Sequence, residues 1–183
     1  MTPTTGRDPD IEPDTKDWTW VLDRPCPECG YDALSVRRIE LAEQLRANAA
    51  AWEPVLGSDG ARLRPSPEVW SPLEYACHVR DVHTVFAGRV RAMLDDDDPL
   101  FENWDQDEAA AKGGYSQQDP VTVAGELATA ADEVADLYTS VPEDAWARPG
   151  RRSNGSAFTV DSIARYHLHD AEHHLADVRR ASR

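Results

Sequence analysis

The stretch YHLHDAEHHLADV, residues Tyr166 to Val178, combines an apolar stripe with four of the six histidines in the chain. Successive residues of a helix lie about 100° apart around its axis. On that projection, five small or aliphatic side chains fall within about 80° of one another: Ala164, Leu168, Ala171, Leu175 and Val178. The stretch therefore predicts a packed amphipathic helix, whose polar residues can be sorted by the side they face.

The polar residues form two pairs at helical spacing. His167 and His174 lie at one edge of the apolar stripe, with Asp170 slightly further round, whereas His169 and His173 fall on the opposite side. Asp170–His174 and His169–His173 are each four residues apart, a spacing at which two side chains can share a metal ion. We expect His169 and His173 to face solvent, and Asp170 and His174 to face the other helices.

A second helix begins at SPLE, residues 71–74. The serine is a helix cap, the proline fits the first helical position, and the glutamate completes a capping box. The helix continues to about Leu94, with His78 about 40° from the centre of its apolar stripe. His78 therefore faces inward, His83 lies on the opposite flank, and Cys77 faces out.

Two more periodic segments complete a set of four helices. The first helix runs from about Asp32 to Val55, the third from Asp119 to about Val141, and the fourth from about Thr159 to Ala181. Residues 95–118 form an unusually long connection, which lets the second and third helices run in the same direction. We predict an all-α four-helix bundle with a long crossover between helices 2 and 3.

We predict that the chain divides into three segments. Residues 1–17 are polar and are expected to be a disordered tail, residues 18–34 form an arm that contains a C-x2-C motif, and residues 35–181 form the bundle. The N-terminus has no apolar core typical of a signal peptide, and no apolar run approaches the roughly 18 residues that span a bilayer. We expect a cytoplasmic protein that does not enter membranes.

Antiparallel packing of the second and fourth helices would bring His78, Asp170 and His174 to the same depth. Two imidazoles and a carboxylate suit a divalent metal, with Zn or Ni as the first choices, and leave a position open for substrate. His167, one turn before Asp170, is either a partner behind the ligands or an alternative ligand. The competing interpretation is that these histidines only form hydrogen bonds within the core.

The segment RPCPECGYD places Cys26 and Cys29 at the C-x2-C spacing of a zinc knuckle. A second zinc site completed by histidines or by another subunit, a redox pair, and a turn with two idle thiols all remain open. An odd count of three cysteines without an export signal indicates reduced thiols.

The net charge of −15 argues against nucleic acid as a partner, because no basic stripe offsets it. Two loops have residues suited to a small-molecule substrate. The carboxylates of ENWDQDE, residues 102–108, could contact substrate, and Trp104 within it is expected to pack over the end of the bundle. The arginines of RRSNGS, residues 151–156, could bind a carboxylate.

The motifs WSPLEYACHVRDV, residues 70–82, and HHLADV, residues 173–178, resemble the DinB-like superfamily over roughly residues 35–180. The resemblance implies a four-helix bundle with this crossover, and metal ligands at His78, His174 and the position four before it. That position is often histidine in the family and is Asp170 here, as in the maleylpyruvate isomerase branch, where it is a carboxylate.

By this resemblance we expect a metal-dependent enzyme that uses a low-molecular-weight thiol, most simply mycothiol, as an S-transferase or isomerase on small electrophiles. Two alternatives are a hydrolase that uses a water bound to the metal, and a non-catalytic metal-binding stress-response protein. A homodimer is also expected.

Overall fold

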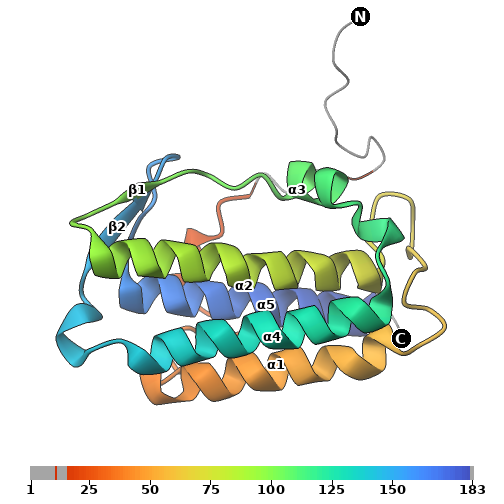
Figure 1. Cartoon of the computed structure of the whole chain (residues 1–183), viewed down its shortest axis with the longest axis horizontal. Coiled ribbons are helices and arrows are strands. Elements are labelled where there is room, and N and C mark those ends of the chain that lie inside the picture. The colour runs from red at the N-terminus through yellow and green to blue at the C-terminus, as the bar shows by residue number, and fades with distance from the viewer. Residues whose placement is uncertain (1–10, 12–15, 182–183) are drawn as a thin grey trace, which may run out of the picture.

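The computed structural model describes Ile11 and residues 16–181, which form a four-helix bundle (Figure 1). Shorter helices and turns lie in the connections, and most of the expected tail, residues 1–17, lies outside the described residues. The predicted bundle with its long crossover is confirmed. The helical elements are α1 (Leu41–Leu56), α2 (Pro72–Asp95), α3 (Gln106–Gly113), α4 (Pro120–Ser140) and α5 (Val160–Ala181), with 3-10 turns at Thr19–Leu22, Arg38–Glu40, Tyr115–Gln117 and Glu143–Ala145.

Helices α2 and α4 run in one direction, and α1 and α5 run in the other (Figure 1). Helices α4 and α5 each pack against both α1 and α2. The parallel course of α2 and α4 requires the crossover of residues 96–119, which returns along the outside of α2 and contains α3. Helices α2 and α5 are therefore antiparallel neighbours, and the residues midway along α5 meet those early in α2.

The predicted cap signals fix the starts of α2 and α4. The hydroxyl of Ser71 accepts the amide of Glu74 at 3.3 Å, and the Glu74 carboxylate accepts the amide of Ser71 at 2.8 Å. The Asp119 carboxylate accepts the amide of Thr122 at 2.9 Å. These bonds satisfy helix amides that have no partner within the helix.

The first helix begins later than the sequence predicted, at Leu41 instead of about Asp32. The Asp32 carboxylate accepts the amide of Leu34 at 3.1 Å, so this residue forms a local turn and does not cap a helix. The chain then enters α1 through the 3-10 turn at Arg38–Glu40. Asp32, near which the helix was expected to begin, therefore belongs to the arm that precedes the bundle.

A three-stranded sheet at one end of the bundle was missed, because its strands are too short to show alternation. It consists of β1 (Leu100–Phe101), β2 (Pro149–Arg152) and β3 (Ala157–Thr159), with β2 parallel to β1 and antiparallel to β3. A Cβ atom on Gly150 would lie 2.6 Å from the Met93 side chain, so this close approach to α2 requires glycine. The sheet ties the start of the crossover to the connection between α4 and α5.

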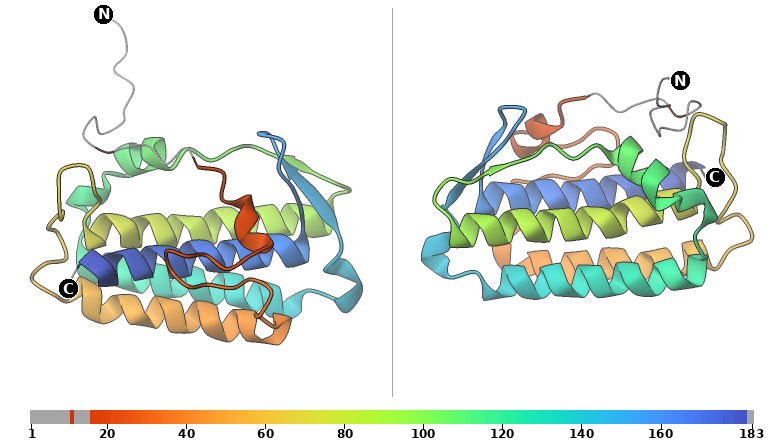
Figure 2. Two further views of the ribbon diagram at one scale, coloured as in Figure 1. Left: turned by 180° about the vertical axis from the view of Figure 1, so that it is seen from behind. Right: turned by 45° about the horizontal axis from the view of Figure 1, so that its top comes forward.

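The predicted arm, residues 18–34, is part of a longer segment that precedes the bundle. This segment, residues 16–37 and called the arm from here on, lies along α5 (Figure 2). Val21 of the arm is buried in the core, and the Tyr31 hydroxyl donates to the carbonyl of Arg165 on α5 at 2.8 Å. The guanidinium of Arg165 in turn donates to the carbonyl of Ala33 at 2.6 Å. The arm and the crossover thus flank the pair α2 and α5. Among the described residues, no helix is both long and apolar enough to cross a membrane.

Candidate metal centre

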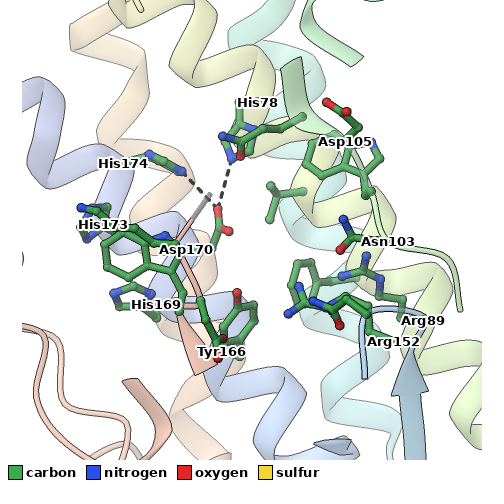
Figure 3. A pocket seen from close by; sticks show the side chains of 18 of the residues that line it. His78, Arg89, Asn103, Asp105, Arg152, Tyr166, His169, Asp170, His173 and His174 are labelled. Atoms are coloured by element: carbon green, nitrogen blue, oxygen red, sulfur yellow. Dashed lines mark hydrogen bonds and ion pairs between the residues drawn. The ribbon is translucent and has the colours of Figure 1, made fainter. Parts of the chain in front are cut away.

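A pocket of about 420 Å³ lies over α2 and α5, between the arm and the crossover (Figure 3). This volume is within the range of small-molecule sites. Helix α5 supplies Asp170 and His174, α2 supplies His78, the crossover supplies Trp104, and the arm supplies Trp18. The pocket is therefore built where the crossover and the arm leave the two helices uncovered.

His78, Asp170 and His174 come together at one wall of this pocket. Nε2 of His78 lies 3.3 Å from Oδ1 of Asp170, and Nε2 of His174 lies 3.5 Å from the same oxygen (Figure 3). One donor atom from each residue lies within 4.8 Å of the others. Asp170 and His174 are one turn apart on α5, and antiparallel packing brings His78 of α2 to their level.

The charges at this wall favour the metal-binding protonation states. Burial, together with the nearby His174, lowers the pKa of His78, so its ring is neutral at pH 7. Burial alone would raise the pKa of Asp170, but contact with His78 and the proximity of His174 hold it well below its usual range. The site therefore presents a neutral imidazole and an ionised carboxylate, the forms that bind metals.

The side chains present fit a divalent metal. Both ring nitrogens of His78 and Oδ1 of Asp170 are shielded from solvent and make no hydrogen bond of good geometry among the described residues. Buried polar atoms without such partners are costly, and a shared cation would satisfy them. Three protein donors beside an open pocket leave room for a further ligand.

Aromatic rings enclose the three donors. The Trp104 indole stacks on His78 with ring centroids 5.4 Å apart and an interplanar angle of 19°. Trp70 contacts His78 from another side at 5.4 Å, and Tyr75 contacts His174 at 5.3 Å. The expectation that Trp104 packs over the end of the bundle was wrong, because the crossover runs along α2 and carries this ring to the metal side of the pocket.

Two arginines lie across the pocket from the three donors (Figure 3). Arg89 of α2 is buried and donates to the carbonyl of Glu102, and Arg152 of β2 donates to Ser156. Neither guanidinium forms an ion pair within residues 16–181. Burial, with the nearby charge of Arg152, lowers the pKa of Arg89 to about 10. Two cations without a direct ion-pair partner among the described residues form a candidate anion-binding site, and the sequence had indicated only the RRSNGS arginines.

His167 is not brought to the three donors. Its Nε2 lies 2.8 Å from Nδ1 of His83, and its Nδ1 lies 2.9 Å from the hydroxyl of Tyr138. Both ring nitrogens are thus engaged inside the bundle, and neither is directed at the metal site. The sequence did not predict the contact between His83 and His167. A helical projection gives the angles of residues around one helix axis, but it gives no distances between two helices.

The expectation that His169 and His173 face solvent was wrong. Both are buried, with exposed fractions of 3% and 6%. The arm covers this side of α5 and brings Cys26 and Cys29 to within 4.8 Å of one donor atom of each histidine. The C-x2-C motif and the outward histidine pair were both visible in the sequence, but nothing in it joined them.

Cys77 was also expected to face outward and is instead fully buried. Its sulfur points to the carbonyl of Tyr115 at 3.9 Å, because the turn at Tyr115–Gln117 of the crossover packs on this side of α2. Segments outside the bundle therefore cover both faces that helical projection assigned to solvent.

Comparison with known proteins agrees with this fold. YfiT from Bacillus subtilis, described as "a probable metal-dependent hydrolase with an unusual four-helix bundle topology", matches with a TM-score of 0.74 over 81% of this chain and 89% of that chain. The two sequences are 14% identical, so this likeness concerns the fold alone. A search of curated proteins found no relative. The sequence model of the DinB superfamily matches residues 40–178, and the chain belongs to this superfamily.

Proposed function

We propose that this member of the DinB superfamily is a metal-dependent enzyme for small anionic substrates, with the metal held by His78, Asp170 and His174. One observation carries the proposal: three donors meet at the wall of an open pocket, and two of them, His78 and Asp170, bring buried atoms without a hydrogen bond among the described residues. A pocket beside the metal favours an enzyme over a metal-storing stress protein, in which the metal would be sealed off. When bound, a Zn or Ni ion would act as a Lewis acid that lowers the pKa of a coordinated thiol or water.

The chain's own residues would then bind and orient the substrate. Arg89 and Arg152 suit a carboxylate or a similar anion, which guanidinium groups recognise through paired hydrogen bonds. Trp104 and Trp18 form apolar walls that would limit access of water to the reacting groups. A substrate anchored by its anion at the arginines would extend its reactive end toward the donors.

Within this frame we propose a thiol-dependent S-transferase or isomerase, with a mycothiol-type thiol as co-substrate. The support is the likeness of the WSPLEYACHVRDV and HHLADV motifs to family members that use such thiols. It also rests on the carboxylate at Asp170, which the isomerase branch shares. The arginine pair offers a place for the carboxylate of either the thiol or the electrophile.

A hydrolase is the second candidate. The observation in its favour is the shared fold with YfiT, together with a donor set that leaves a position open for water. The two candidates differ in whether a thiol is consumed.

The deciding experiment uses metal-loaded, tag-free protein and an electrophilic dye, with and without mycothiol. Thiol conjugation that depends on mycothiol and is lost in Asp170→Asn supports the transferase. Hydrolysis of ester or amide substrates without thiol, lost in the same variant, supports the hydrolase. The matched control is Glu133→Gln, an exposed acid on α4 outside the pocket, which should behave as wild type. Activity that persists in Asp170→Asn at full rate would contradict the proposed site.

A further inference from the structure

A second cluster of donor atoms lies where the arm meets α5, and its two histidines, His169 and His173, also line the pocket. Cys26, Cys29, His169 and His173 each offer one donor atom, and all four lie within 4.8 Å of one another. The sulfur of Cys26 is 3.7 Å from Nδ1 of His173, and both thiols are free. The cluster shares no residue with the His78, Asp170 and His174 site.

The local structure prepares both halves of this cluster. In the arm, the amide of Cys26 donates to the carbonyl of Tyr31, and the amide of Gly30 donates to the carbonyl of Cys26, each at 2.8 Å. Gly30 has a φ of +79°, which a glycine adopts without strain. This turn presents both sulfurs on one side, as zinc knuckles do. On α5, His169 and His173 are one turn apart and face the same side.

The histidines are oriented as ligands usually are. Nε2 of His169 is buried and makes no hydrogen bond among the described residues. Nε2 of His173 lies 3.5 Å from Asp177 and 3.7 Å from Glu28, which leaves its Nδ1 directed at Cys26. Carboxylates behind a ligating imidazole fix its tautomer and strengthen it as a ligand.

Burial favours the neutral forms of two members of this cluster. It raises the pKa of the Cys29 thiol to about 12, so this thiol is protonated at pH 7. Burial also lowers the pKa of His169 to about 4, so this ring is neutral at pH 7. Without a metal, a protonated Cys29 thiol and a neutral His169 ring would lie together, and Nε2 of His169 would stay buried without a hydrogen bond among the described residues.

We propose that Cys26, Cys29, His169 and His173 bind a structural zinc ion that fastens the N-terminal arm to α5. Two thiolates and two imidazoles form a closed tetrahedral set, with no position left for substrate. This differs from the three-donor site in the pocket, where a position stays open. The two sites would therefore hold metals with different roles.

The proposed zinc would also shape the pocket. Trp18 of the arm contacts the rings of His169 and His173, with centroids 5.6 Å and 4.8 Å apart, and it lines the pocket. Fixing Cys26 and Cys29 to α5 holds the arm, and with it this tryptophan wall, in place. Removal of the zinc should loosen the arm while leaving the four long helices folded, because these helices pack directly on one another.

The test is cobalt substitution of tag-free protein, read by absorption. Cobalt bound by thiolates gives a sulfur-to-cobalt charge-transfer band, which the His–Asp–His site cannot produce. We expect this band in wild type, in His174→Ala and in Cys77→Ser, a control for the third cysteine. We expect its loss in Cys29→Ser and His169→Asn. Zinc content should fall by one ion per chain in each of the last two variants.

A second readout uses wild type alone and does not depend on variants that fold. Chelation should expose Cys26 and Cys29 to alkylation and increase amide exchange in residues 16–31, and added zinc should reverse both changes. The inference is overturned if the band is absent from wild type, or if it survives in Cys29→Ser. It is equally overturned if chelation leaves alkylation unchanged, or if protein purified without reductant contains a Cys26–Cys29 disulfide instead of zinc.

Discussion

Asp170 is the residue on which the proposed metal site depends most. Its Oδ1 lies 3.3 Å from Nε2 of His78 and 3.5 Å from Nε2 of His174, and its negative charge is the only one that the three donors bring. The same carboxylate stabilises any cation placed there, because a metal ion bound by two neutral rings alone would lack charge compensation.

We therefore predict that Asp170→Asn keeps the fold and lowers metal affinity at this site by about 100-fold or more, since even residues behind metal ligands contribute 10- to 100-fold. Metal titration followed by mass spectrometry measures this change. Glu133→Gln is the control and should bind as wild type. Unchanged affinity in Asp170→Asn would remove this residue from the site.

Arg152 tests the anion-binding wall of the pocket. A charge-assisted hydrogen bond contributes roughly 1.5–3 kcal/mol, so Arg152→Gln should raise KM for an anionic substrate about 10- to 100-fold with little change in kcat. Arg151→Gln is a matched control, because the neighbouring Arg151 is exposed, pairs with Asp98 and does not line the pocket. Equal effects of the two substitutions would argue against recognition by Arg152.

His83 should make the metal-free protein sensitive to acid. Burial lowers the pKa of His83 from 6.5 to about 4. Between pH 6.5 and about 4 the unfolded chain therefore binds more protons than the folded protein, and the free energy of unfolding falls as the pH drops. The loss should approach roughly 3 kcal/mol at the acid end of this range. In His83→Gln, which keeps a polar partner for His167, unfolding by urea should depend less on pH between 7.5 and 5. Parallel pH profiles for the two proteins would show that His83 does not titrate this way.

At the scale of the elements, the cap signals predicted helix starts more reliably than polar residues taken alone. Ser71 with Glu74, and Asp119 with Pro120, fixed α2 and α4 because the bonds involved are local. The first helix was predicted without such a signal, and it begins at Leu41 because the Asp32 carboxylate accepts an amide within a turn of the arm. The strands at Leu100 and Pro149 could not be predicted, because their pairing joins segments far apart in the chain.

The capping box of α2 gives a stability prediction. Ser71→Ala removes the acceptor for the Glu74 amide, and it should lower the free energy of unfolding by about 1 kcal/mol while metal binding at His78 persists. Denaturant unfolding with a metal titration measures both quantities. Ser140→Ala, which removes an exposed hydroxyl bonded only to the Leu137 carbonyl, should cost less. A larger loss for Ser140→Ala would contradict the importance of this cap.

At the scale of the whole molecule, two segments outside the bundle complete the site. Helical projection placed His78, Asp170 and His174 on inward faces, and the crossover explained how they could meet. Helical projection was wrong for Cys77, His169 and His173, because the crossover and the arm cover the helix faces that it assigned to solvent. Contacts of this kind depend on the path of a connection through space, which periodicity within a helix does not contain.

The same organisation separates two tasks in one small chain. The pair α2 and α5 carries the donors beside the open pocket, while the arm and the crossover form its walls through Trp18 and Trp104. Two positively charged side chains of the pocket, Arg89 and Arg152, face the metal-binding donors across the cavity (Figure 3). Membership of the DinB superfamily accounts for the helices, and the walls are the part through which substrate choice would be set.

A metal ion bound between His78, Asp170 and His174 is the basis of the proposed function. Anomalous diffraction from crystals of metal-replete, tag-free protein, measured on both sides of the absorption edge of the bound metal, tests it most directly. We expect an anomalous peak within bonding distance of one nitrogen of each histidine and one oxygen of Asp170. A map of fully metal-loaded protein with no peak between these three residues would contradict it.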